Sequence, residues 1–252
     1  MLSVKQLEDY EANGFVILDY QLPENDLEEI KSASDRIINK YPQYRDYCPM
    51  LLKYDLHFLK YARDKNILNC VKQIIGPDVA LWNQSFFAKP AINGKATPWH
   101  QDGQYWPIKP LATCTVWIAI DDTSEENGCL EFIPGSHRKK ETLNHYTDNN
   151  PNYTLNQELK KSCYNPNKSI SLCLKAGQMS IHDVYLVHGS KENKSKKSRR
   201  GMTMRFMPTT SYFDRSFAKQ ISLDTGIDHR ERTLFLMSGI DKSGKNDFRI
   251  RM

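Results

Sequence analysis

Two histidines and one aspartate are the residues of this sequence best suited to chemistry at a metal ion. His100 and Asp102 stand two positions apart in PWHQDGQYW, and His188 follows much later in YLVHGS. On a strand, residues i and i+2 point to the same face, so the first two side chains would reach one metal ion. His188 ends another apolar segment, before a glycine where the chain can turn. The spacing therefore predicts a three-residue metal site.

The residue types of this site favour iron over structural zinc. Two imidazoles and one carboxylate on one face of a metal leave positions open for substrate and dioxygen, as in non-haem iron oxygenases. The motif offers no thiolate partner, which argues against a structural zinc site. A mononuclear zinc hydrolase with the same three ligands and a non-enzymatic metal-binding sensor barrel remain alternatives. Production of succinate in stoichiometric amounts would separate both from an oxygenase.

Other histidines are weighed against this assignment. His182 lies six positions before His188, an even offset, so on one regular strand both would share a face. It is either a pocket residue or a rival ligand. His137 follows Pro-Gly-Ser and is typical of a loop. No partner at metal-ligand spacing accompanies the remaining three, which are His57, His145 and His229.

An arginine beyond His188 suits the binding of a co-substrate carboxylate. Arg199 follows His188 by 11 positions (199 minus 188), at the start of the apolar run GMTMRFM. A guanidinium grips a carboxylate through two parallel hydrogen bonds, which lysine does not. Ser190 would donate a hydroxyl to the same group. Arg200 is equally basic, and because strand neighbours face opposite sides, only one of the two arginines points inward.

The elements that must position these residues are helices first and strands later. Ser3 and Gln6 form a capping-box start, Pro23 opens a second helix, and a third closes at Gly76-Pro77. Short apolar runs separated by turn residues then predict strands; they occupy 15–18, 79–89, 113–120, 129–133, 170–174, 179–188 and 201–207. The pattern predicts a mainly β barrel or sandwich with helices packed outside.

The chain is expected to form a single domain over residues 1–252. Residues 1–78 would form a mostly helical flank, 79–210 the β core and 211–252 a C-terminal extension. Within the core, residues 137–168 are polar and rich in asparagine, which is typical of a surface excursion.

Composition and charge restrict the class of protein. With 39% hydrophobic and 26% charged residues, the composition is that of a soluble globular protein. No apolar run approaches the roughly 18 residues of a membrane helix, and the acidic start does not resemble a secretory signal. The six scattered cysteines are expected to be reduced, in line with a cytoplasmic location.

The net charge of +5 is concentrated at residues 191–200. No aromatic side chains alternate with these charges, as nucleic-acid stacking would require, so nucleic acid is an unlikely partner. A solvated loop is the expected structure.

Three motifs together resemble the phytanoyl-CoA dioxygenase family. They are the His100-Gln101-Asp102 triplet, NGCLEFIPGSH at 127–137 and HGSKENKSKKSRR at 188–200. The resemblance runs from about Phe86 to Phe206. It implies a double-stranded β-helix (jelly-roll, cupin-like) core and an Fe(II)- and 2-oxoglutarate-dependent dioxygenase that consumes O2.

The resemblance also implies roles for individual residues. His100, Asp102 and His188 would bind iron, and Arg199 would bind the far carboxylate of 2-oxoglutarate. The same co-substrate pocket would include Ser190, Trp117 and, on a looser match, Lys53. Related halogenases carry a small residue in place of the aspartate, so the presence of Asp102 favours hydroxylation of an unactivated C–H bond in a small molecule, with release of succinate and CO2.

The sequence indicates the residues of the substrate pocket less specifically than it indicates the metal ligands. The aromatic residues that flank the metal motif would either wall this pocket or pack in the barrel. Its candidate residues are Trp99, Tyr105, Trp106, His182 and Arg205.

Overall fold

The computed structural model describes residues 1–251, and its core is two facing antiparallel sheets. The large sheet has the order β1-β11-β6-β13-β3-β15, and β2 also pairs with β3. Its strands are β1 (Phe15–Ile17), β2 (Tyr47–Cys48), β3 (Val79–Lys89), β6 (Cys114–Ala119), β11 (Met179–Asp183), β13 (Arg199–Pro208) and β15 (Phe235–Ser238).

The small sheet has the order β10-β7-β12-β4. Its strands are β4 (Thr97–His100), β7 (Leu130–Phe132), β10 (Ile170–Leu172) and β12 (His188–Ser190). Two further pairs lie outside these sheets: β5 (Ile108–Lys109) with β14 (Tyr212–Phe213), and β8 (His145–Thr147) with β9 (Gln157–Leu159). The predicted jelly-roll core is confirmed.

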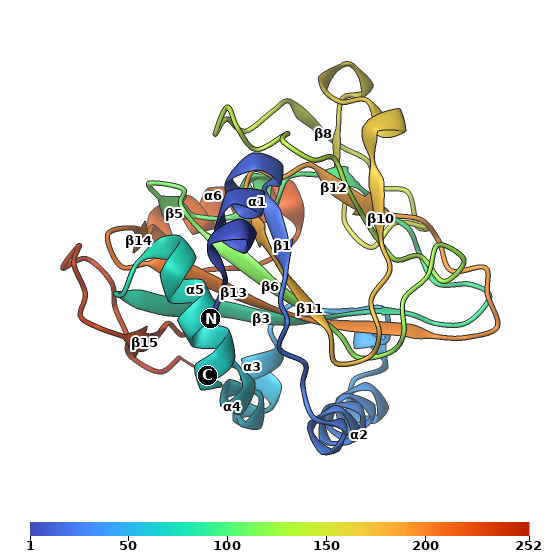
Figure 1. Ribbon diagram of the computed structural model, residues 1–252, viewed down its shortest axis with the longest axis horizontal. Coiled ribbons are helices and arrows are strands. Elements are labelled where there is room, and N and C mark those ends of the chain that lie inside the picture. The colour runs from blue at the N-terminus through green and yellow to red at the C-terminus, as the bar shows by residue number, and fades with distance from the viewer. Residues whose placement is uncertain (252) are drawn as a thin grey trace.

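Helices cover one face of the large sheet. In Figure 1, α2, α3 and α4 lie below that sheet, and strands β10 and β12 of the small sheet lie on its other side. The α-helices are α1 (Val4–Asn13), α2 (Glu24–Lys40), α3 (Leu51–Tyr54), α4 (Leu59–Ala62), α5 (Lys65–Ile75) and α6 (Arg215–Thr225). The 3-10 helices are η1 (Pro42–Tyr44), η2 (Leu56–Phe58), η3 (Asp102–Tyr105), η4 (Lys161–Cys163) and η5 (Pro166–Lys168).

The alternation along β13 separates the apolar core from the chemical interior. Met202, Met204 and Phe206 are fully buried in one cluster with apolar side chains of the helices, such as Ile30 and Ile67. The intervening residues of β13 face the other way, into the space between the two sheets. Burial of each large apolar side chain contributes about 1.5–3 kcal/mol, so this outer layer holds the large sheet in place while its inner face carries polar groups.

Two local predictions at the N-terminus are confirmed. Ser3 and Gln6 form the capping box that starts α1, and Gly14 ends the helix with φ of 85°, a left-handed conformation that favours glycine. Helix α2 begins directly after Pro23.

The segment 179–188 differs from its prediction as a single strand. It forms β11 of the large sheet and the start of β12 in the small sheet, with residues 184–187 turning between them. The apolar residues of the turn, Val184, Leu186 and Val187, are buried where the chain passes from one sheet to the other. The apolar residues of 184–187 therefore form a buried turn between the two sheets and do not continue the strand.

The polar excursion and the C-terminal extension both contact the β core. Within 137–168, strand β9 packs against β4, and the backbone N–H of Leu143 donates to the side-chain oxygen of Gln101 at 2.7 Å. In the C-terminal part, β15 pairs with β3. All six cysteines are free, as expected, and none of the helices in the described part of the chain combines the length and apolarity of a membrane span.

Candidate active site

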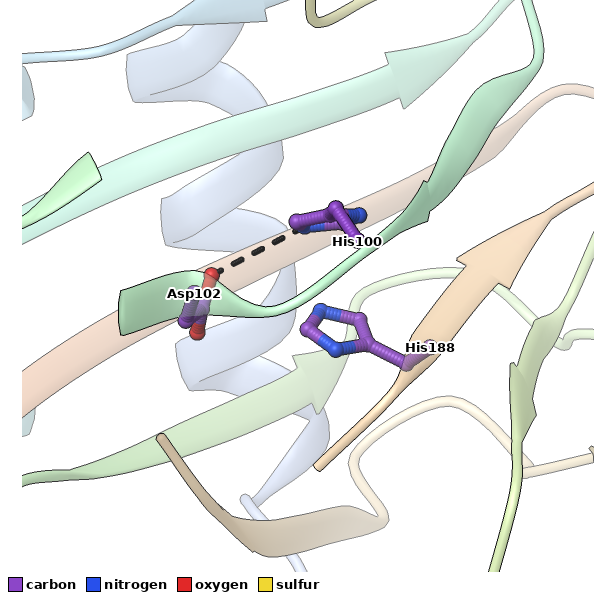
Figure 2. Close-up of side chains that lie close together, drawn as sticks. All are labelled: His100, Asp102 and His188. Carbon is purple, nitrogen blue, oxygen red and sulfur yellow. Dashed lines mark ion pairs between the residues drawn. The ribbon is translucent and has the colours of Figure 1, made fainter. Parts of the chain in front are cut away.

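The three predicted metal ligands meet between the sheets. Their candidate ligand atoms all lie within 4.8 Å of one another, and the three side chains are buried. His100 and His188 are direct cross-strand partners on β4 and β12, with ring centroids 4.2 Å apart. Figure 2 shows the carboxylate of Asp102 opposite the two rings, with Oδ1 3.8 Å from Nε2 of His100.

Asp102 is positioned by a different element from the predicted strand. Strand β4 ends at His100, and Asp102 begins the short helix η3, so the two residues do not share a strand face. The tight turn of η3 brings the carboxylate back beside the imidazole. The expectation of a strand continuing through Asp102 was wrong, although the predicted residues do lie together.

Backbone carbonyls orient both imidazole rings. Nδ1 of His100 lies 2.8 Å from the carbonyl oxygen of Pro98, and Nδ1 of His188 lies 2.9 Å from that of Leu186. A carbonyl accepts only, so Nδ1 carries the proton in each ring and Nε2 keeps a free lone pair. Both rings are thereby prepared to bind a metal through Nε2.

Asp102 is held through one of its two oxygens. The hydroxyl of Thr115 donates to Oδ2 at 2.9 Å, and Nε2 of His182 lies 3.5 Å from the same oxygen. Oδ1 is left facing His100. His182 therefore lies beside the carboxylate rather than among the three clustered ligand atoms, and it does so from β11, in a different sheet from His188.

The site holds its groups in the protonation states that bind metals. Burial lowers the pKa of His100 and, to a greater extent, that of His188, so both rings are neutral at neutral pH. Burial by itself raises the pKa of Asp102, but the neighbouring His182, Arg205 and His188 outweigh it and hold that pKa below its usual range. Two neutral imidazoles and one carboxylate suit a divalent cation.

Arg199 occupies one end of the same cavity. The cavity measures about 30 Å³ and is lined by the triad together with Thr115, Trp117, His182, Ser190, Arg199 and Arg205, among others. Arg199 is only 1% exposed, and its guanidinium lies 5.4 Å from the ring centroid of Trp117. The buried hydroxyl of Ser190 has no hydrogen-bond partner within the described residues.

The backbone at Gly128 positions this arginine. Nε of Arg199 donates to the carbonyl oxygen of Gly128 at 3.0 Å, and Nη2 donates to the same oxygen. Gly128 has φ of 76°, and a Cβ atom there would lie 2.4 Å from the carbonyl oxygen of Lys191. Glycine is therefore required, and it belongs to the motif NGCLEFIPGSH.

Lys89 is a buried cation next to Arg199 that the sequence analysis did not single out; its Nζ donates to the carbonyl oxygen of Lys95. It is the cross-strand partner of Arg199 between β3 and β13 and is 2% exposed. Burial, and then the charge of Arg199, lower its pKa well below the usual value. The sequence offers little indication of this: Lys89 is the last residue of β3, and a lysine at the end of a strand is normally expected to be exposed.

Lys53 was the sequence candidate for this pocket, and the structure corrects that assignment. Lys53 is exposed on α3 and borders a different cavity, of about 370 Å³, from that of the triad. The loose match between α3 and the family motif selected a lysine on the wrong element.

Arg200 points away from Arg199, as strand alternation requires. It forms an ion pair with Asp121, in which Nη2 and Nε of Arg200 each lie 2.9 Å from a carboxylate oxygen. The register that places Arg199 inward is thus the observed one.

The remaining pocket candidates divide into two groups. His182 and Arg205 line the cavity of the triad. Tyr105 and Trp106 are buried in an apolar cluster next to this cavity. The rings of Tyr105 and His100 form an edge-to-face pair with centroids 5.9 Å apart. Trp99 faces the opposite side of β4 from His100 and packs against Tyr164, with ring centroids 5.6 Å apart. Its placement in the substrate pocket was therefore wrong, whereas barrel packing describes it correctly.

Residues 191–198 of the basic run form a largely exposed loop between β12 and β13, held by buried Asn193, whereas Arg199 and Arg200 belong to β13. We expect replacement of Lys194, Lys196 and Lys197 by Gln to change the apparent constant for 2-oxoglutarate by no more than about twofold, because exposed charges are screened beyond roughly 8–10 Å. Steady-state kinetics at low and high salt would measure this. A large loss of affinity, or salt-sensitive binding of nucleic acid by the wild type, would contradict the assignment of a solvated loop.

Comparison with known sequences decides the family. Residues 10–201 match the family described as phytanoyl-CoA dioxygenase (PhyH). The chain belongs to the phytanoyl-CoA dioxygenase family. Two relatives are the peroxisomal phytanoyl-CoA dioxygenase of Homo sapiens, 26% identical over 84% of this chain and 70% of that protein, and the ectoine dioxygenase of Bordetella parapertussis, 25% identical over 81% and 74%.

As a member of this family, the protein is a non-haem dioxygenase that uses Fe(II), 2-oxoglutarate and O2. Solved structures agree on the fold. The non-haem monooxygenase ThoJ in its apo form superimposes with a TM-score of 0.74 at 20% identity, over 97% of this chain and 88% of that one. EvdO2 from Micromonospora carbonacea var. aurantiaca, complexed with 2-oxoglutarate, gives 0.68 at 20% identity, over 82% and 91%.

Proposed function

We propose that this dioxygenase hydroxylates an unactivated C–H bond of a small molecule, with His100, Asp102 and His188 binding Fe(II). The observation that carries the proposal is the convergence of these three side chains in one cavity with Arg199. The iron, when bound, supplies the activation of dioxygen. The protein supplies two neutral imidazoles with free Nε2 atoms and a carboxylate with one oriented oxygen.

Arg199 is proposed to bind the far carboxylate of 2-oxoglutarate, with Lys89 as a neighbouring positive charge whose Nζ donates to the carbonyl oxygen of Lys95. Both side chains are buried, and within residues 1–251 neither forms an ion pair with a carboxylate. Two buried cations side by side are costly unless an anion compensates them. The unpartnered hydroxyl of Ser190 and the ring of Trp117 complete this end of the cavity.

Asp102 favours hydroxylation over halogenation. Halogenation at such a site needs an open position for chloride, and here a carboxylate fixed by Thr115 fills that position. The buried surroundings also exclude water from the reacting atoms, which protects a reactive centre from side reactions.

We expect the protein supplied with Fe(II) and 2-oxoglutarate to release succinate slowly without substrate, and at least tenfold faster with a true substrate. A library of metabolites, scored by succinate release and by the mass of the product, would measure this. A product heavier by one oxygen atom supports hydroxylation. Hydrolysis of a substrate with zinc bound and without succinate would instead support the zinc hydrolase, and metal binding without any turnover would support the sensor.

A further inference from the structure

The inner faces of β3 and β13 carry positive charge at both ends. Four cross-strand pairs line this interior, namely Lys89 with Arg199, Phe87 with Gly201, Ser85 with Thr203, and Asn83 with Arg205. Arg199 and Arg205 are six residues apart on one strand, so their backbones are separated by about 20 Å at a rise of roughly 3.4 Å per residue. One end serves 2-oxoglutarate in the proposed function, and Arg205 marks the other.

Arg205 is buried beside the triad with part of its hydrogen-bonding capacity unused. It is 5% exposed and lines the same cavity as His100, Asp102 and His188. Nη1 donates to the hydroxyl of Ser85 at 2.7 Å, while Nε has no partner within residues 1–251. Two aromatic faces flank the guanidinium, those of Phe87 at 5.8 Å and Trp106 at 5.4 Å. No carboxylate in the described part of the chain pairs with it.

A second buried arginine, Arg232, is linked to Arg205 by hydrogen bonds, although it lines the neighbouring cavity of about 370 Å³ and not the cavity of the triad. Arg232, also 5% exposed, donates through Nη1 to the side-chain oxygen of Asn83 and to the carbonyl oxygen of Pro49 at 3.0 Å. The amide of Asn83 in turn donates to Ser85 at 3.0 Å, so a polar chain links the two arginines.

This second arginine is also left short of partners. Nη2 of Arg232 is buried and unpartnered within residues 1–251. Burial lowers the pKa of Arg232 to about 9. Like Arg205, Arg232 has no ion pair with a carboxylate in the described chain.

We propose that Arg205, with Arg232 linked to it by hydrogen bonds, binds a carboxylate of the substrate, which is therefore a small free acid rather than a thioester, ester or amide. This inference rests on the proposed function, since it assumes that Arg199 takes the co-substrate. Asp102 interacts electrostatically with Arg205, but no carboxylate forms a direct ion pair with this guanidinium, and a buried guanidinium in that situation is stabilised by a bidentate anion. Because Arg205 and the triad share one small cavity, the anionic group lies close to the carbon that is oxidised. A long carrier with distant phosphates does not meet that requirement.

The test is a binding measurement without turnover. Protein saturated with Mn(II) and 2-oxoglutarate is titrated calorimetrically with acetate, hexanoate and benzoate, and with the matching primary amides. We expect at least one acid to bind saturably and at least about tenfold more tightly than its amide, since hydrogen bonds to charged groups contribute about 1.5–3 kcal/mol. Arg205→Gln is expected to lose that acid binding by tenfold or more, with little change in the affinity for 2-oxoglutarate.

Two variants control for charge and for folding. Arg200→Gln removes the same charge on the opposite face of β13 and is expected to leave acid binding unchanged. Arg205→Lys keeps the charge but loses the planar fork, so its acid affinity should lie between those of the wild type and Arg205→Gln. Thermal melting reports on folding: a variant that still melts cooperatively near the wild-type temperature is folded, so its loss of acid binding is then due to the changed side chain.

The outcomes separate this inference from the proposed function. Failure of the wild type to bind 2-oxoglutarate would reject the proposed function itself. Intact binding of 2-oxoglutarate with no acid bound, with amides bound as tightly as acids, or with acids unaffected by Arg205→Gln would reject the carboxylate site alone. Tighter binding of methyl phosphate than of any acid would assign a phosphate group instead and overturn the proposal.

Discussion

His188→Ala is expected to abolish the visible charge-transfer band that Fe(II) and 2-oxoglutarate give in the absence of oxygen, and to reduce succinate formation at least about a hundredfold. Loss of a group that merely supports a metal ligand costs 10–100-fold in affinity or activity, so loss of a ligand should cost no less. The ring of His188 is buried, with Nδ1 held by the carbonyl of Leu186, and the cluster of candidate ligand atoms in the described structure contains only His100, Asp102 and His188.

Two histidine variants make this experiment specific. His57→Ala removes an exposed imidazole on η2, far from the cavity in the fold, and should keep the full band. His182→Gln removes the ring beside Asp102 and should weaken the band without abolishing it, because His182 contacts the carboxylate and lies outside the cluster of ligand atoms. A band that survives in His188→Ala but vanishes in His182→Gln would exchange their roles. Circular dichroism would confirm that each variant is folded.

Arg199→Ala is expected to raise the apparent constant for 2-oxoglutarate at least tenfold, while iron binding survives. Removal of one partner from a buried charge pair typically costs about 2–5 kcal/mol. Arg199→Lys should also weaken binding, since it retains the charge but loses the two parallel hydrogen bonds. Steady-state kinetics at varied 2-oxoglutarate, with metal binding measured separately, would test both variants.

Arg200→Ala is the matched control for Arg199. Its guanidinium pairs with Asp121 outside the barrel, so its loss should lower stability rather than co-substrate affinity. A loss of about 1 kcal/mol corresponds to roughly 2–4 °C in the melting temperature of a protein of this size. If Arg200→Ala abolished turnover and Arg199→Ala were tolerated, the roles of the two would be reversed. If neither variant mattered, the assignment of the co-substrate end of the cavity would fail.

Local sequence patterns predicted the candidate metal ligands and several of the elements that carry them. The side-chain alternation of a strand is a property of the backbone alone, so the sequence showed that only one of Arg199 and Arg200 points inward, and the family resemblance indicated Arg199. The observed register agrees with that choice. The capping box at Ser3 and the long strand at 79–89 were equally readable, because each depends on residues close together in the chain. The residue types of the triad then indicated the metal.

Pairing between distant segments decided the rest. Lys89 joins Arg199 only because β3 and β13 pair in one register, and a shift of one residue would turn every side chain of a strand to the other face. The same register makes Asn83 the cross-strand partner of Arg205. Arg232, from the C-terminal segment, donates a hydrogen bond to that asparagine. No local pattern contains this information, because it depends on how the two sheets and the extension pack together. The sequence by itself thus predicted the three candidate metal ligands and restricted the inward cation to one of two arginines, because both follow from local spacing, whereas only the tertiary structure decided which other buried cations lie near them.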